Sequence, residues 1–294
     1  MIYSAVAKTD IGTKRRINQD SLLIRHLVKG SSEILLSVVC DGMGGLSSGE
    51  VASATVINRL SNWFDEEIIA KCETNIRVIC DKLVLLLREI NSDLINYGAK
   101  RNIKLGTTFT GLLFIGNQLL LVHIGDTRLY HLGKEIKQIT KDHTYIAKAL
   151  ALGEITEEKA KTDKRRNALT QCIGASSHIE PQVVIGNSFT GGYLLCSDGF
   201  RHKISSTDIY KELCPSKQTS EETIRQNLQK LIEENKLLGE TDNISAIYIL
   251  RKKDSVIQSN RLDKINLSKR MIFSIGLFLL SILMMIIGII VLCI

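Results

Sequence analysis

The sequence has little proline, and this scarcity limits how the chain can be divided. Only two prolines occur among the 294 residues, and no stretch rich in proline, glycine and serine interrupts the first 250 residues. Flexible linkers between domains usually have such a composition. We therefore expect residues 1–250 to form one domain. The chain also lacks an internal repeat, which excludes a repeat architecture.

The cysteines lack the spacing of a metal or redox motif. None of the seven forms a Cys-x-x-Cys pair, and Cys40 and Cys196 lie inside apolar runs. This pattern favours buried free thiols in a reducing compartment. The N-terminus has no apolar segment of signal-peptide length. Zinc-finger spacing and an aromatic RNA-binding motif are also absent, so we expect no nucleic acid as a partner.

Residues 271–294 contain no charged side chain and are mostly apolar. About 20 apolar residues suffice for a transmembrane helix, so this segment predicts a single-pass tail anchor. Seven basic and two acidic residues lie in 251–270, so this linker carries most of the net charge of +7. Basic flanks favour the cytoplasmic side and contacts with anionic lipid. The predicted organisation is a domain over 1–250, a basic juxtamembrane linker over 251–270 and a transmembrane helix over 271–294.

The hydrophobic pattern of residues 1–250 predicts an α+β fold. Because strands flank two long helical segments and recur after them, we expect stacked antiparallel sheets with helices outside. Residues 107–139 have the pattern of a β-meander, and Gly98 is expected to stop a helix. The predicted strands are 3–8, 21–27, 33–40, 107–115, 118–124, 128–132, 134–139, 182–189, 193–196 and 244–250; the predicted helices are 49–64, 65–97, 142–152, 157–161 and 221–238.

Aspartates stand next to the ends of several predicted strands. Asp41 follows the apolar run 38–40 and precedes a glycine, and Asp198 repeats this pattern. Each Asp-Gly pair alone is typical of a turn. Several such residues in one chain indicate that the sheets bring carboxylates together. The full set is Asp20, Asp41, Asp126, Asp198 and Asp242.

Carboxylates that share a cleft repel one another, and a multivalent cation relieves the repulsion. Carboxylate, carbonyl and water oxygens suit Mg²⁺ or Mn²⁺. A single carboxylate that bridges two such ions would support the activation of water for displacement at phosphorus. Gly42 could offer its carbonyl oxygen and leave room for ions and substrate.

The motifs around these residues resemble, in the same order, those of the bacterial PPM/PP2C metal-dependent protein Ser/Thr phosphatases. The resemblance covers roughly residues 1–250 and implies an αββα sandwich with a two-metal centre between the sheets. The shared motifs are GTKRRINQDS (12–21), VVCDGMGG (38–45), GTT (106–108), HIGDTRLY (123–130), KDHT (141–144), RRNALTQCIG (165–174), LLCSDGF (194–200) and TDNIS (241–245).

The resemblance implies a role for each metal ligand. Asp41 resembles the carboxylate that bridges both ions, and Gly42 resembles the carbonyl ligand. Asp198 and Asp242 resemble ligands of the ion on the other side. Asp126 resembles the residue that completes a third, weaker site, which it shares with Asp198.

Two further residues are implied to act in catalysis. Asp20 resembles an acid that holds metal-bound water, and Arg15 resembles the arginine that grips the substrate phosphate, a task that suits a guanidinium fork. Lys14 and Arg16 are the nearby alternatives to Arg15.

The chain departs from the family pattern at two positions. Met43 stands where some members have a histidine that serves as general acid, and methionine cannot donate a proton. Gln19 stands where many relatives have glutamate. His143 could replace the missing acid, although a structural role fits it better.

The segment 144–179 resembles the family's flap. Its basic side chains either contact phosphopeptides or are ordinary surface charge. They are Lys161, Lys164, Arg165 and Arg166.

The resemblance implies hydrolysis of phosphoserine and phosphothreonine on proteins at the cytoplasmic membrane face. A hydroxide that bridges two Mn²⁺ or Mg²⁺ ions would attack phosphorus directly, without a phospho-enzyme. The expected partners are membrane lipid and phosphorylated proteins, including a Ser/Thr protein kinase and its substrates. Two alternatives stay open: a membrane-anchored pseudo-phosphatase that binds phosphoproteins without turnover, and a phosphatase of small phosphoesters.

Overall fold

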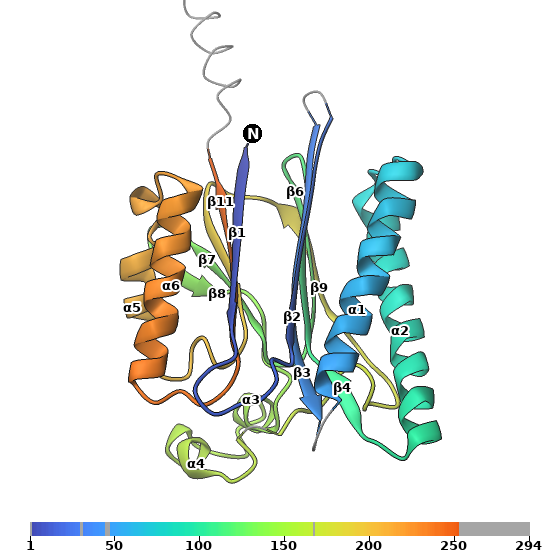
Figure 1. The fold of residues 1–294 in the computed structure, drawn as a ribbon, viewed down its shortest axis with the longest axis vertical. Coiled ribbons are helices and arrows are strands. Elements are labelled where there is room, and N and C mark those ends of the chain that lie inside the picture. Colours follow the sequence, from blue (N-terminus) through green and yellow to red (C-terminus); the bar gives the residue numbers. More distant parts are fainter. Residues whose placement is uncertain (1, 30–31, 45–47, 167, 253–294) are drawn as a thin grey trace, which may run out of the picture. The chain divides into compact units, whose positions relative to one another are not determined.

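Two antiparallel sheets stand face to face at the centre of the structure (Figure 1). The computed structural model describes residues 2–29, 32–44, 48–166 and 168–252. The first sheet has the order β1 (Tyr3–Asp10), β11 (Ile244–Arg251), β10 (Gly191–Cys196), β7 (Arg128–Leu132) and β8 (Ile136–Gln138). The second has the order β2 (Asp20–Lys29), β3 (Ser32–Gly44), β5 (Phe109–Ile115), β6 (Gln118–Ile124) and β9 (Gln182–Asn187), and β4 (Leu105–Thr107) pairs with the end of β3.

Helices cover the outer face of each sheet (Figure 1). The second sheet carries α1 (Gly49–Trp63), the π-helical η1 (Phe64–Ala70) and α2 (Ile76–Arg101), and the first carries α5 (Ser206–Leu213) and α6 (Glu221–Leu237). A 3₁₀ turn, η2 (Pro215–Lys217), follows α5. Two short helices, α3 (Tyr145–Ala151) and α4 (Glu157–Thr162), lie beyond one end of the sheets. The predicted α+β class with two antiparallel sheets and flanking helices is confirmed.

Strand β3 is apolar on both faces because both faces are covered. Its side chains alternate between the cluster under α1 and α2 and the cluster between the sheets. A two-sided burial of this kind explains the unbroken apolar run in the sequence. Leu36 and Val38 face the helices, whereas Leu35 and Val39 face the other sheet.

The predicted β-meander over 107–139 is wrong in its pairing. Strands β5 and β6 belong to the second sheet, whereas β7 and β8 belong to the first. The chain therefore crosses between the sheets after Ile124. Gly125 makes this turn with a φ of 106°, and a Cβ there would lie 2.6 Å from Cγ2 of Thr108. The crossing places Asp126 at the point where the chain leaves one sheet for the other.

The helix expected over 65–97 is interrupted and then continues past Gly98. Residues 71–75 leave the helix, and α2 restarts where the Asn75 side chain caps the backbone N–H groups of Arg77 and Val78. Gly98 does not stop α2, which runs to Arg101. Its missing side chain instead makes room, because a Cβ there would lie 2.7 Å from the Ile103 carbonyl oxygen. Helix α5 was not predicted.

The predicted membrane segment cannot be compared with this architecture. Apart from the first two residues of the linker, the segments 251–270 and 271–294 lie outside the described residues. Within the described ranges, no helix has both the length and the apolar character needed to cross a bilayer.

Candidate functional site

Four of the five predicted aspartates line one cavity. The cavity has a volume of about 570 Å³, and Asp41, Asp126, Asp198 and Asp242 contribute to its wall. Arg15 and the backbone of Gly42 line it as well, together with Met43 and Lys104. The residues that the sequence pattern singled out therefore meet in space, although they are spread over more than 200 residues of the chain.

The backbone of Asp41 is held by the two threonines of the GTT motif. Asp41 N–H donates to Thr108 Oγ1 at 2.9 Å, and its carbonyl oxygen accepts from Thr108 N–H at 2.9 Å and from Thr107 Oγ1 at 3.0 Å. These bonds fix the position from which the carboxylate enters the cavity. The motif thus has a structural explanation: it joins β4 and β5 to the end of β3.

Gly42 is required by the packing of backbone against backbone. Its N–H donates to the Gln19 carbonyl oxygen at 3.1 Å. A Cβ at Gly42 would lie 2.5 Å from that oxygen and 2.3 Å from the Gly49 carbonyl oxygen at the start of α1. The expected reason for this glycine, space for ions, is therefore incomplete, because the protein itself fills the space next to it.

Asp20 lies directly opposite Asp41 in the β2–β3 register. Its side chain is buried, and neither carboxylate oxygen has a hydrogen-bond donor at normal distance. Burial raises the pKa of Asp20 to about 7, and the charge of Asp198 acts in the same direction. A buried carboxylate without donors requires a partner, and water or a cation would provide one.

The ends of β10 and β11 carry Asp198 and Asp242. A backbone hydrogen bond joins the chain next to these two acids, since Ser197 N–H donates to the Ser245 carbonyl oxygen at 3.0 Å. A Cβ at Gly199 would lie 2.1 Å from the Asn243 carbonyl oxygen, so only glycine allows this approach. The Asp-Gly pair of residues 198–199 therefore brings the Asp198 turn against the segment of Asp242.

Arg15 forms an ion pair with Asp242, with Nη2 2.7 Å from Oδ2. Its side chain is 49% exposed, so the guanidinium remains accessible from the cavity. Of the three basic residues 14–16, Arg15 lines the cavity in the described part of the chain, whereas Lys14 and Arg16 lie on the surface. The resemblance assigns the phosphate-binding role to Arg15 and leaves Lys14 and Arg16 as alternatives, and of these three the cavity wall includes Arg15.

Two polar residues near the site were missed by sequence reasoning. Asn243 accepts the Gln19 N–H at 2.9 Å and donates to the carbonyl oxygens of Ile11 and Ile17 at 2.9 and 3.2 Å, so it holds the loop that carries Arg15. His202 lies between two acids: Nε2 is 3.3 Å from Asp198 Oδ2, and Nδ1 is 3.4 Å from an oxygen of Glu240.

Asn243 lies in the shared motif TDNIS, which could have drawn attention to it, but its three partners lie more than 220 residues away in the chain. Glu240 is buried, and one of its oxygens accepts the N–H groups of Thr241 and Asp242 at 2.7 and 2.9 Å. His202 therefore links the Asp198 turn to the Asp242 turn through Glu240.

His143 does not line the cavity, and its contacts indicate a structural role. Its Nδ1 accepts the Gly125 N–H at 3.1 Å and lies 2.9 Å from Gln171 Nε2. Burial lowers the pKa of His143. These contacts support the crossing turn before Asp126. Met43 does line the cavity. It stands at the position where some family members have a histidine.

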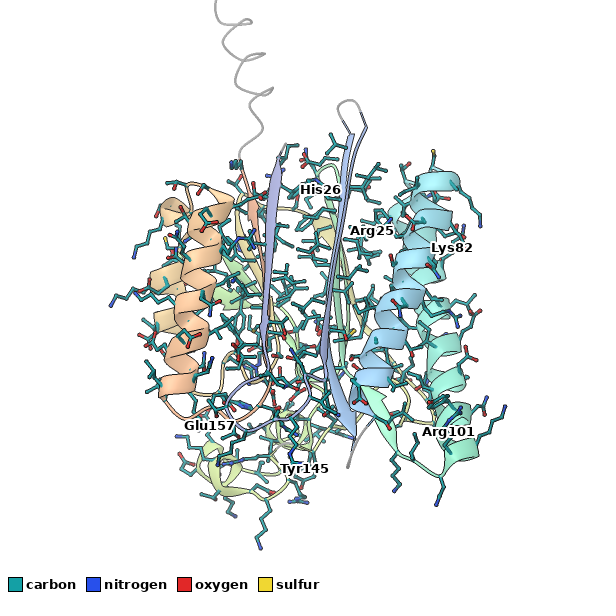
Figure 2. The ribbon with its side chains drawn as sticks, viewed as in Figure 1. Arg25, His26, Lys82, Arg101, Tyr145 and Glu157 are labelled. Atoms are coloured by element: carbon teal, nitrogen blue, oxygen red, sulfur yellow. The ribbon has the colours of Figure 1, made fainter. Side chains whose placement is uncertain are left out.

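The flap segment folds as α3, α4 and connecting loops. Figure 2 labels Tyr145 and Glu157 in it, at the end of the structure opposite to Arg25 and His26. Arg165 is engaged within the flap, since it pairs with Asp163 at 2.9 Å and stacks over the Tyr145 ring at 3.8 Å. Arg165 therefore has a structural role within the flap.

The charges of the cavity fit divalent ions. Burial and the charges of Asp20 and Asp198 raise the pKa of Asp41 well above its usual range, and burial raises the pKa of Asp126 to about 7. Asp198 Oδ1 is buried without a hydrogen-bond donor. The donors are all oxygen, the type that Mg²⁺ and Mn²⁺ prefer.

The acids line one cavity but are not arranged as a preformed metal site. Among the described residues, no three His, Cys, Asp or Glu side chains form a ready cluster for a metal ion. In this structure Arg15 pairs with Asp242, and His202 contacts Asp198. Asp41, Asp198 and Asp242 nevertheless line one cavity.

Comparison with known proteins gives a consistent result. The sequence model of the family described as protein phosphatase 2C matches residues 13–233. Protein phosphatase PhpP of Streptococcus pneumoniae is 29% identical over 252 residues, which are 84% of this chain and 97% of that protein. The Ser/Thr phosphatase Stp1 of Staphylococcus aureus has a similar structure, with a TM-score of 0.74 and 28% identity over 85% of this chain and 95% of that one.

A further relative has been solved with metal ions. Serine/threonine protein phosphatase PstP of Mycobacterium tuberculosis is 32% identical over 253 residues, 84% of this chain and 45% of that protein. The structure of the PstP catalytic domain in complex with two manganese ions has a TM-score of 0.67 and 31% identity, and covers 84% of this chain and 97% of that one.

Proposed function

The chain belongs to the protein phosphatase 2C family and is a protein Ser/Thr phosphatase, and from this premise we propose that it works with bound Mn²⁺ or Mg²⁺ at the cytoplasmic face of a membrane. The observation that carries the metal-dependent part is the cavity in which Asp41, Asp198 and Asp242 meet. Carboxylates that repel one another in one cavity, as Asp41 and Asp198 do, are expected where a cation binds.

Asp41, Asp198, Asp242 and the Gly42 carbonyl would hold two divalent ions. When bound, such ions supply an activated water and stabilise the charge that develops on phosphoryl oxygens. The protein supplies the rest. Asp41 is held in place by the GTT threonines, and the carboxylate of Asp20 behind it can accept a hydrogen from water at either oxygen.

Arg15 would bind the phosphate of the substrate. Its guanidinium lies on the cavity wall and is half exposed, so a phosphate can replace Asp242 as its partner. A planar fork with two parallel donors suits two phosphate oxygens. Met43 cannot protonate the leaving alkoxide, so in this proposal the proton comes from water.

The two alternative functions predict different outcomes in one experiment. The full-length chain is assayed on a phosphothreonine peptide and on small phosphoesters, with Mn²⁺ or with a chelator. Turnover of the peptide that requires Mn²⁺ and is lost in Asp41→Asn and Asp198→Asn supports the proposal. Binding of the phosphopeptide without turnover would support a pseudo-phosphatase, and faster turnover of small phosphoesters would support the other alternative.

The membrane part of the proposal rests on sequence alone. Residues 271–294 carry no charge, and the basic residues 251–270 precede them. A phosphorylated Ser/Thr kinase in the same membrane is a suitable substrate, because tethering raises effective concentration. Fractionation tests the anchor: we expect the full-length chain in the membrane pellet after an alkaline wash and a chain that ends at Lys252 in the supernatant. Full-length protein in the supernatant would contradict it.

A further inference from the structure

Arg201 is a largely buried cation next to Asp126. Its Nη2 donates to the Asp126 carbonyl oxygen at 3.0 Å and lies 3.9 Å from Asp126 Oδ2. The side chains of Arg201 and Asp126 are only 13% and 15% exposed. A guanidinium keeps its charge at all relevant pH values. A fixed positive charge therefore lies next to the carboxylate to which the family resemblance assigns a third metal site.

A second acid near Arg201 is already neutralised by another arginine. Asp142 Oδ2 lies 3.9 Å from Arg201 Nη2, but Arg128 donates three hydrogen bonds to Asp142, the shortest at 2.6 Å. Gln138 donates a further bond to Asp142 at 3.1 Å. The charge of Asp142 is thus matched by Arg128, which leaves Asp126 as the acid whose charge Arg201 matches.

Arg201 also connects Asp126 to the turn that carries Asp198. The backbone N–H of Arg201 donates to the Asp198 carbonyl oxygen at 3.0 Å, so both residues belong to one turn. The contact between Arg201 and Asp126 therefore joins this turn to the crossing between β6 and β7. A divalent ion bound at Asp126 would lie next to the guanidinium, and the two positive charges would repel each other.

We propose that Arg201 is the permanent counter-cation of Asp126, so that Asp126 positions the Asp198 turn instead of binding a divalent ion. Asp126 and Arg201 are then positioning residues, and the chain binds two ions rather than three. The inference rests on the proposed function, because it assumes that Asp41, Asp198 and Asp242 hold divalent ions.

Counting bound Mn²⁺ tests the inference without an activity assay. The full-length chain and its variants are dialysed against increasing Mn²⁺, and bound metal per chain is measured by atomic emission. We expect two ions for the unchanged chain and for Asp126→Asn. Arg201→Gln should gain a weaker third ion, and the double variant with Asp126→Asn should lose it again. Arg201→Lys, which keeps the charge, is the matched control and should bind two.

The outcomes separate the inference from the proposed function. Three ions in the unchanged chain that fall to two in Asp126→Asn would overturn the inference alone, and this arm does not depend on whether an Arg201 variant folds. Two ions in an Arg201→Gln chain whose circular dichroism shows a native fold would also overturn it. Absence of any bound Mn²⁺ in the unchanged chain would remove the metal centre itself and with it the proposed function.

Discussion

Asp20 and Asp41 face each other across the register of two adjacent antiparallel strands, β2 and β3. Like charges at paired positions destabilise a sheet. Burial raises the pKa of both carboxyls, and Asp20 adds to the shift of Asp41. The fold therefore holds two acids where the protein alone cannot stabilise both negative charges. Such an arrangement is expected at a functional site, where residues that bind a ligand can lower the stability of the fold.

The first prediction is that Asp41→Asn separates activity from stability. Turnover of a phosphopeptide should fall by about 100-fold or more, since a metal centre contributes several kcal/mol to catalysis. The metal-free variant should nevertheless melt roughly 2–4 °C higher than the unchanged chain, because removal of one charge relieves about 1 kcal/mol of repulsion. Calorimetry with a chelator measures the shift. A lower melting temperature would show that Asp41 has stabilising partners other than a cation.

The second prediction concerns Arg15, which the structure pairs with Asp242. Arg15→Ala should lower kcat/KM for a phosphopeptide about 10–100-fold, the loss expected for a charge-assisted hydrogen bond to phosphate. The Mn²⁺ concentration for half-maximal activity should not rise, because the substitution frees Asp242 for the ion. Arg16→Ala, at an exposed neighbour outside the cavity wall, is the control and should change neither value. A higher Mn²⁺ requirement in Arg15→Ala would show that the arginine instead positions Asp242 for the metal.

The third prediction tests the packing of Gly42. A methyl group there would overlap the carbonyl oxygens of Gly49 and Gln19, both part of backbone that cannot move easily. Gly42→Ala should lower the free energy of unfolding by about 3 kcal/mol, the upper part of the range for overpacking. Gly186→Ala is the matched control, because a Cβ at Gly186 meets no atom within 4 Å, and its effect should stay within about 0.5 kcal/mol. Denaturant unfolding compares the two. Equal effects would contradict the steric explanation.

The fourth prediction concerns His202, which contacts Asp198 and Glu240. Residues that orient metal ligands typically contribute 10–100-fold to metal affinity. His202→Ala should therefore weaken Mn²⁺ binding about 10-fold, as measured by isothermal titration calorimetry of the folded variant. Lys203→Ala, at the next and exposed position, should leave the affinity unchanged. Unchanged affinity in His202→Ala would mean that the histidine does not orient Asp198.

Local pattern was sufficient for features that depend on one segment. The apolar run before Asp41 predicts a buried strand. The Asp-Gly pairs after such runs predict that Asp41 and Asp198 lie at the ends of strands. The same reasoning failed for the meander, since β6 and β7 look alike in sequence but belong to different sheets. Periodicity records which residues are buried, and it does not record which strand lies next to which.

Residues that act through distant partners left no local signal. Asn243 lies in the shared motif TDNIS, but its role as a partner of three backbone groups follows only from contacts with segments far away in the chain, and the role of His202 follows only from its contacts with Asp198 and Glu240. Arg201 is a further example, because a charged residue after a turn is usually expected on the surface. The sequence therefore indicated the acids of the site but not the residues that hold those acids in place.

The fifth prediction is a pH dependence of stability that comes from His123. The ring is fully buried: Nδ1 lies 2.8 Å from Thr110 Oγ1, and Nε2 lies 3.2 Å from the Lys141 carbonyl oxygen. Burial, with the nearby His143 ring, lowers the pKa of His123 to about 4. The unfolded chain titrates near its ordinary pKa of about 6.5. Between these values the unfolded chain binds more protons, so His123 makes stability fall as the pH decreases from about 6.5 toward 4.

His123→Gln isolates this contribution. The variant loses packing at every pH, but it cannot take up the proton, so its stability relative to the unchanged chain should improve by about 2 kcal/mol between pH 7 and pH 5. Urea unfolding at both pH values, with the same Mn²⁺ concentration in every sample, measures the difference. The acids of the metal site are present in both proteins, so their titration cancels in the comparison. A gap that stays constant with pH would mean that His123 keeps an ordinary pKa in the folded chain, and that burial between Thr110 and Lys141 does not exclude its charged form.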